Sequence, residues 1–128
     1  MDTQEKIVLI VEKDTGIANM IRAILGIVNV PVKHTQQGRE AMAVVKESTI
    51  GLIICEKQMP DMTGYELLTF ARSYPATSNV PFIMLIDEAD KSHEKLEPAQ
   101  RADRYITKPF TARKVLDVVK EFIVYKGL

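Results

Sequence analysis

The fold of this 128-residue chain is decided by residues 51–64, which read GLIICEKQMPDMTG. Residues 52–55 are apolar without interruption and are predicted to form a buried strand. Glu56 follows where that strand should end, and a turn rich in Pro, Asp and Gly comes next. In open parallel sheets, ligands bind at the carboxyl ends of the strands. A carboxylate at this position is therefore a stronger functional hint than a charge on a helix face.

Two other predicted strands also end in charged residues. Residues 7–11 (IVLIV) run into Glu12, Lys13 and Asp14, and residues 105–107 run into Lys108. Apolar runs without alternation are typical of strands that are covered on both faces. Further strands are predicted over residues 30–35 and 80–86, which complete a set of five.

Apolar residues at helical spacing separate these strands. The first helix is predicted from residues 17, 20, 21, 24, 25 and 28, and others begin at Gly38, at Thr63 and before Val115. The segment 90–104 is a poor helix, because Leu96 is almost its only large apolar residue and Pro98 would break or kink it. We expect this segment to be irregular or mobile.

Strands alternating with helices of this length predict an α/β fold, a doubly wound five-stranded parallel sheet of (βα)5 type. Right-handed crossovers leave few topologies, and strand order 2-1-3-4-5, the flavodoxin-like order, is favoured. Strands 1 and 3 then flank the switch point, so we expect Glu12, Lys13 and Glu56 to meet in one crevice. The length fits a single domain over residues 1–128.

The composition narrows the range of functions. Lys plus Arg and Asp plus Glu both number 17, so no charge excess argues for a nucleic-acid or membrane-surface partner. No apolar run reaches the roughly 18 residues of a membrane span, and the first residues have no signal-peptide character. The single cysteine, Cys55, excludes an internal disulfide. We therefore expect a cytoplasmic protein. His34 and His93 have no metal-ligating neighbour at suitable spacing and are expected at the surface.

With these features the sequence resembles the CheY-like receiver domain of two-component response regulators. The resemblance covers essentially the whole chain and is most specific over residues 59–64 (MPDMTG) and 105–110 (YITKPF). It implies two acidic residues after strand 1 that hold Mg²⁺, and an Asp after strand 3 that accepts a phosphoryl group from a histidine kinase. It also implies a hydroxyl residue after strand 4, a Lys after strand 5, and a cis bond at Lys108-Pro109.

Residue by residue, the chain matches this pattern at Lys108 and only in charge at Glu12. Lys13 stands in place of the second acid, Glu56 in place of the phosphoacceptor Asp, and Ile86 in place of the hydroxyl residue. The Lys13 ammonium would repel a metal ion, and the longer Glu56 side chain would displace the reacting oxygen by about an ångström, which can cost about 100-fold in rate. Ile86 cannot hydrogen-bond a phosphoryl group or draw in the switch aromatic, Tyr105.

We therefore interpret the chain as a pseudo-receiver, a non-enzymatic signalling module that works without a metal cofactor. Lys13 and Lys108 are expected to clamp Glu56 and fix the strand-end loops, including Lys57, Gln58, Pro60 and Gly64. Two alternatives remain open. One is a phosphoacceptor regulator modified at Glu56 or Asp87, and the other is a module that binds a small anionic ligand.

The predicted partner is a protein, either a histidine kinase or a downstream regulator. The resemblance places its contact on the face formed by the 90–104 segment, the fifth strand with Tyr105, and the last helix. Nucleic acid and membrane are not expected partners. Whether Tyr105 and the pocket adopt an active-like or an inactive-like arrangement is left open by Ile86 and Glu56, which argue in opposite directions.

Overall fold

The structure, a computed structural model, describes residues 6–123. Five strands form one parallel sheet in the order β2-β1-β3-β4-β5, as the sequence predicted. The strands are β1 (Ile7–Val11), β2 (Val32–Thr35), β3 (Ile50–Glu56), β4 (Phe82–Asp87) and β5 (Arg104–Lys108). Four α-helices accompany them: α1 (Thr15–Ile27), α2 (Gly38–Glu47), α3 (Gly64–Ser73) and α4 (Ala112–Lys120).

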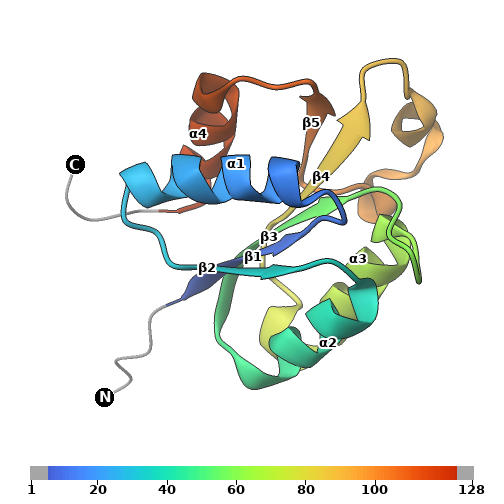
Figure 1. The fold of residues 1–128 in the computed structure, drawn as a ribbon. Helices are drawn as coiled ribbons and strands as arrows, with labels where there is room; N and C mark the ends of the chain where they lie inside the picture. The colour runs from blue at the N-terminus through green and yellow to red at the C-terminus, as the bar shows by residue number, and fades with distance from the viewer. Residues whose placement is uncertain (1–5, 124–128) are drawn as a thin grey trace.

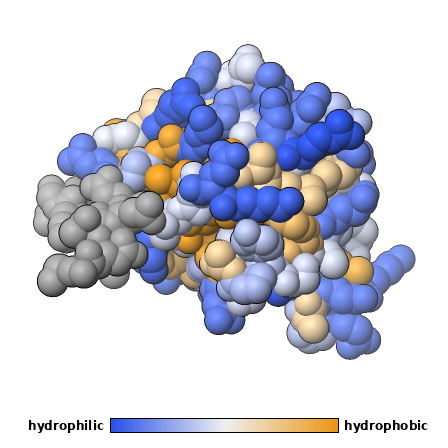
Figure 2. Space-filling view, turned by 90° about the horizontal axis from the view of Figure 1, so that it is seen from below, coloured by the Kyte–Doolittle hydropathy of each residue, from blue (hydrophilic) through white to orange (hydrophobic). Residues whose placement is uncertain are grey.

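The helices cover the sheet on both sides, with α1 and α4 on one face and α2 and α3 on the other (Figure 1). Successive residues of β1 point to opposite faces. Val8 and Ile10 therefore pack with α1 and α4, whereas Leu9 and Val11 pack with α2 and α3. This is why β1 is apolar at every position, whereas the edge strands β2 and β5 also carry polar and charged residues. In the view from below, apolar atoms form a central patch that hydrophilic side chains surround (Figure 2).

Local capping fixes where the helices begin. The Asp14 carboxylate accepts a hydrogen bond from the Ile17 N–H at the start of α1. Thr63 and Glu66 form the predicted capping box of α3, in which each side chain bonds the other residue's backbone N–H. Because Asp14 directly follows the strand-end residues Glu12 and Lys13, its cap also fixes the path of the loop after β1.

The connection from β4 to β5 departs from the βα pattern. Two short 3₁₀ helices, Ser92–Lys95 and Pro98–Gln100, take the place of an α-helix. Pro98 has no N–H to donate, and the Arg101 guanidinium binds the carbonyl oxygens of Glu94 and Leu96 that a longer helix would have used. The irregular character expected from the sequence is confirmed, and the expectation of five complete βα units is wrong for this unit.

Candidate functional site

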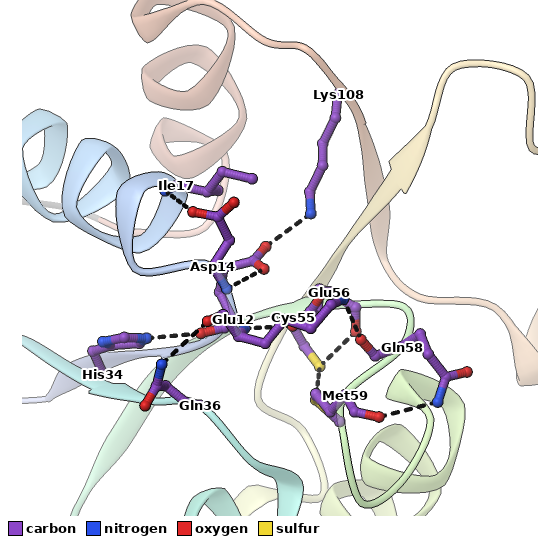
Figure 3. Close-up of polar contacts among 11 residues, drawn as sticks. Glu12, Asp14, Ile17, His34, Gln36, Cys55, Glu56, Gln58, Met59 and Lys108 are labelled. Carbon is purple, nitrogen blue, oxygen red and sulfur yellow. Dashed lines mark hydrogen bonds and ion pairs between the residues drawn. The ribbon is translucent and has the colours of Figure 1, made fainter.

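Glu56 is the last residue of β3, and its side chain is buried. Lys13 engages both of its carboxylate oxygens. The Lys13 backbone N–H donates to Oε2 and the Lys13 ammonium donates to Oε1, each at 2.5 Å. The ammonium also donates to the backbone carbonyl of Gln58 at 2.9 Å. Lys13 thus ties the loop after β1 to the loop after β3. Glu56 and Gln58, its two partners, are labelled in Figure 3.

Glu12, the residue after β1, is fully buried. Its Oε1 accepts from the ammonium of Lys108 at 2.9 Å, and its Oε2 accepts from the Asp14 N–H at 3.1 Å (Figure 3). The backbone of Glu12 is held as well, because its N–H donates to the carbonyl of Thr35. Three strand ends, those of β1, β2 and β5, therefore meet at this one residue.

The predicted meeting of strand-end residues is confirmed, and one of the expected contacts is wrong. Glu12, Lys13 and Glu56 come together at the carboxyl ends of β1 and β3, but Lys108 pairs with Glu12 rather than with Glu56. The reason is that Lys13 already occupies both oxygens of Glu56, whereas the Oε1 of Glu12 is free of backbone donors. The result is two separate ion pairs with no net charge.

Burial and pairing act on the pKa values of this cluster in opposite directions. Burial raises the pKa of Glu56 above its usual range, while the two hydrogen bonds from Lys13 oppose that rise. The hydrogen bond with Glu56 raises the pKa of Lys13, and the nearby charges of Glu12 and Asp87 add to the rise. Lys13 is therefore held as a cation at neutral pH.

The turn after β3 is braced from within. Gln58 and Thr63 form an isolated antiparallel bridge, and the Gly64 N–H donates to the Lys57 carbonyl at 2.6 Å. A Cβ atom at Gly64 would lie 2.6 Å from the backbone oxygen of Glu56, so only glycine allows α3 to start this close to the strand end. Pro60 is exposed at the tip of the turn.

Lys57 forms a contact that the sequence did not indicate. Its ammonium lies 2.5 Å from Oδ2 of Asp90 and 2.8 Å from the hydroxyl of Ser92. This contact ties the loop after β3 to the beginning of the irregular β4–β5 connection. Asp90 was not singled out because its 33-residue separation from Lys57 gives no local pattern.

Tyr105 is partly buried against the α2–α3 side of the core, to which Ile86 also belongs. Its hydroxyl lies 3.0 Å from the Tyr65 hydroxyl and accepts from the Ala102 N–H at 3.0 Å. The ring of His93 stacks on the Tyr105 ring with 4.3 Å between centroids. The switch-equivalent tyrosine is thus held by α3 and by the β4–β5 connection.

The two histidines, expected at the surface, are only partly exposed. His93 is partly buried against Tyr105, and within residues 6–123 its Nδ1 has no hydrogen-bond partner. His34 is also partly buried, and its Nε2 lies 2.9 Å from the carbonyl oxygen of Glu12. A histidine without a metal-ligating pattern can therefore still be partly buried. Ring stacking covers His93, and a single backbone contact holds His34.

Asp87, the other carboxylate considered as a phosphoacceptor, ends β4 and is exposed. It lies opposite Lys108 in the register of β4 and β5.

Within residues 6–123, no group of three or more His, Cys, Asp or Glu side chains is arranged to hold a metal ion. The Lys108-Pro109 peptide bond is cis, as the family resemblance implied.

A surface groove of about 450 Å³ lies away from the crevice, between α3 and the 3₁₀ segment. Its walls come from Tyr65, Leu68 and Arg72 on α3 and from Leu96 and Ala99 on the connection. No helix in the described part of the chain is long and apolar enough to cross a membrane.

Known sequences resemble this chain over almost its full length. Regulatory protein VanRB of Enterococcus faecalis is 32% identical over 120 residues, which cover 94% of this chain and 53% of VanRB. The DNA-binding response regulator MtrA of Mycobacterium tuberculosis is 28% identical over 120 residues, covering 94% and 51%. The chain therefore spans about half the length of these curated relatives.

Solved structures agree with the sequence matches. Chemotaxis response regulator CheY4 of Vibrio cholerae superposes with a TM-score of 0.84 at 26% identity, covering 94% of this chain and 100% of CheY4. A CheY-like receiver domain protein of Methanospirillum hungatei gives a TM-score of 0.81 at 29% identity, covering 92% and 93%. The family model for the response regulator receiver domain matches residues 8–120. The chain belongs to the response regulator receiver domain family of two-component signalling.

Proposed function

We propose that this receiver domain signals without phosphorylation, as a pseudo-receiver that acts through protein–protein contact in the cytoplasm. The observation that carries the proposal is the pair of internal ion pairs at the strand ends, Lys13 with Glu56 and Lys108 with Glu12. The carboxylate oxygens of Glu12 and Glu56, which would receive a metal ion or a phosphoryl group, are engaged by the chain's own ammonium and backbone N–H groups.

The donor set does not fit the Mg²⁺ ion that the family resemblance implies. Mg²⁺ requires near-octahedral oxygen ligation, with one or two carboxylates in its shell. Here the ammonium of Lys13 lies against both the Glu56 carboxylate and the Gln58 carbonyl, and Lys108 neutralises Glu12. A cation entering this cluster would have to displace an ammonium and would meet no net negative charge.

The position of Glu56 also disfavours phosphoryl transfer. An attacking carboxylate oxygen must be free and in line with the phosphorus atom. Both oxygens of Glu56 accept short hydrogen bonds from Lys13. Within residues 6–123 the Asp87 carboxylate accepts no hydrogen bond of this kind, but it is exposed at the end of β4 and no cluster of metal-ligating side chains there would stabilise the developing charge.

The partner surface in this proposal consists of the β4–β5 connection, β5 and α4. The connection is held by side-chain contacts rather than by the hydrogen bonds of a regular helix: Lys57 binds Asp90 at its start, His93 stacks on Tyr105, and Arg72 of α3 donates to the Ala99 carbonyl. Few apolar anchors and no regular helix make this segment the part of the face that a kinase or a downstream regulator would remodel most easily. Tyr105, on the adjoining strand β5, stacks against His93 of the connection and would report such binding.

Incubation with acetyl phosphate and Mg²⁺, followed by intact-mass measurement, tests the proposal. We expect no added phosphoryl group on the natural sequence. A phosphorylatable receiver serves as the assay control, and the triple variant Lys13→Asp/Glu56→Asp/Ile86→Thr restores the family pattern on this backbone. A phosphoryl adduct on the natural chain that Glu56→Gln or Asp87→Asn abolishes would contradict the proposal and identify the acceptor.

A further inference from the structure

Helix α1 carries an apolar face that the fold does not use. Met20 is 48% exposed and Ile27 is 68% exposed, and they are the two exposed large hydrophobic residues within residues 6–123. They lie seven residues apart, on the same side of the helix. Gly16 and Ala23 are exposed on that side as well, at the intervening positions. These four residues, 16, 20, 23 and 27, are called the α1 stripe.

The α1 stripe is unusual in charge as well as in hydrophobicity. Arg22 is the one charged residue in the thirteen of α1, whereas the nine residues of α4 include four. At 100° per residue, Arg22 lies about 130° around the helix from the centre of the stripe. Depletion of charge at the centre of an exposed patch is the compositional mark of a protein contact.

We propose that the α1 stripe is a contact between two copies of this chain, packed antiparallel about a two-fold axis between Met20 and Ala23. Along the stripe the side chains alternate small, large, small, large. In an antiparallel pair, Ile27 of one copy therefore lies over Gly16 of the other, and Met20 lies over Ala23. Each contact occurs twice, as two-fold symmetry requires.

The alternative arrangement of the same two helices does not pack. In a parallel pair in register each residue meets its own copy, so the two Ile27 side chains would hold the helices apart at one end while the two Gly16 residues left a gap at the other. A pattern that fills its own gaps only when reversed argues for a second copy as the occupant rather than an unrelated helix. Figure 1 shows α1 on the outside of the sheet beside α4, and among the described elements none covers its outer side.

The contact is a weak one by its size. A 13-residue helix is about 20 Å long, and a single helix pair of this length covers less than the roughly 1,200 Å² of stable interfaces. The dimer should therefore form at high protein concentration and dissociate on dilution. The dimer does not depend on the ion pairs at the strand ends, so its test is independent of the test of the proposed function.

Sedimentation velocity over a concentration series tests the contact. We expect the sedimentation coefficient of the natural chain to rise with concentration, and Ile27→Glu to remove that rise. Arg22→Glu is the matched control, since it places the same charge on the same helix away from the stripe and should leave the rise unchanged. Both sites are exposed, so circular dichroism should show an unchanged fold. A natural chain that stays monomeric, or a dimer unaffected by Ile27→Glu, would overturn the proposal.

Cross-linking with a short bismaleimide tests the orientation. Gly16→Cys and Ile27→Cys are made separately, and the natural chain is the control because Cys55 is fully buried. An antiparallel pair places residue 16 beside residue 27, while two copies of residue 16 lie about 16 Å apart along the axis. Cross-links should therefore form in the mixture of the two variants and not in either one alone. Cross-linking of Gly16→Cys with itself would show a parallel pair and overturn the proposed geometry.

Discussion

The backbone N–H and the side-chain ammonium of Lys13 bind the two carboxylate oxygens of Glu56, each at 2.5 Å. One residue thus supplies both partners of a buried acid that lies 43 positions later in the chain. Lys108 and the Asp14 N–H do the same for Glu12. The four charges at the strand ends are compensated within the protein, and several measurable consequences follow from how unequally the two pairs are exposed.

Removing Lys108 should cost more stability than removing Lys13. The Lys108 side chain is 22% exposed and its partner Glu12 is buried, whereas the Lys13 side chain is 52% exposed and solvent screens its pair. We expect Lys108→Met to lower the free energy of unfolding by about 3 kcal/mol, because it leaves a buried carboxylate without its cation. We expect about 1 kcal/mol for Lys13→Met, whose backbone N–H still reaches Glu56. Urea denaturation followed by circular dichroism measures both.

The double variant Glu12→Gln/Lys108→Met separates pairing from packing. If the loss comes from an uncompensated charge, neutralising Glu12 should recover part of it. An equal or greater loss in the double variant would mean that Lys108 stabilises the fold through its aliphatic stem instead.

Magnesium affinity should depend on Lys13. Calorimetric titration of the natural chain with millimolar Mg²⁺ should give no binding heat, because Lys13 and Lys108 bring the combined charge of themselves, Glu12 and Glu56 to zero. Lys13→Asp changes that charge to about −2 and supplies a further oxygen donor, so we expect measurable binding. Lys13→Met is the matched control, which removes the ammonium without adding a ligand and should bind more weakly. Binding by the natural chain equal to that of Lys13→Asp would contradict this account of the crevice.

Stability should fall in acid partly through Asp90. The hydrogen bond from Lys57 holds the pKa of Asp90 below its ordinary value of 3.8, and two hydrogen bonds from Ser92 act in the same direction. A carboxyl whose pKa is lower in the folded state stabilises the fold above the unfolded-state pKa and loses that contribution as the pH falls below it. We expect Asp90→Asn to lower the free energy of unfolding at pH 7 by up to about 1 kcal/mol, since the pair is near the surface.

The same variant should flatten the pH dependence. As the pH falls from about 4 towards the lowered pKa of folded Asp90, the stabilities of the natural chain and Asp90→Asn should converge progressively, because the carboxyl of the unfolded chain becomes protonated before that of the folded chain. Ser92→Ala keeps the ion pair and removes only the hydroxyl, so it should retain most of the pH dependence. A constant difference between the natural chain and Asp90→Asn across pH 2–7 would exclude the ion pair as the cause.

The sequence predicted the sheet chiefly because β1, the middle of β3 and most of β4 are apolar without alternation, a pattern typical of strands covered on both faces. Their ends were less predictable: the strand expected over 52–55 extends over Ile50–Glu56. Charge placement at the strand ends likewise predicted the crevice. It did not predict that Lys108 pairs with Glu12 rather than with Glu56. That pairing depends on which carboxylate oxygens already accept hydrogen bonds from other donors. The contact of Lys57 with Asp90 depends on an irregular segment whose path no periodicity describes.

The start of α3 should tolerate no side chain larger than hydrogen. In Gly64→Ala the new Cβ would lie 2.6 Å from the backbone oxygen of Glu56 and 3.3 Å from the Cα of Lys57, and backbone atoms cannot move aside as a flexible side chain would. We expect a loss of about 1–3 kcal/mol in the free energy of unfolding. Gly26→Ala in α1 is the matched control, because nothing lies within 4 Å of its added Cβ. That change should stabilise the chain by about 0.5–1 kcal/mol through helix propensity. Urea denaturation compares the two, and a Gly64→Ala variant as stable as the natural chain would show that the turn after β3 can shift away from Glu56.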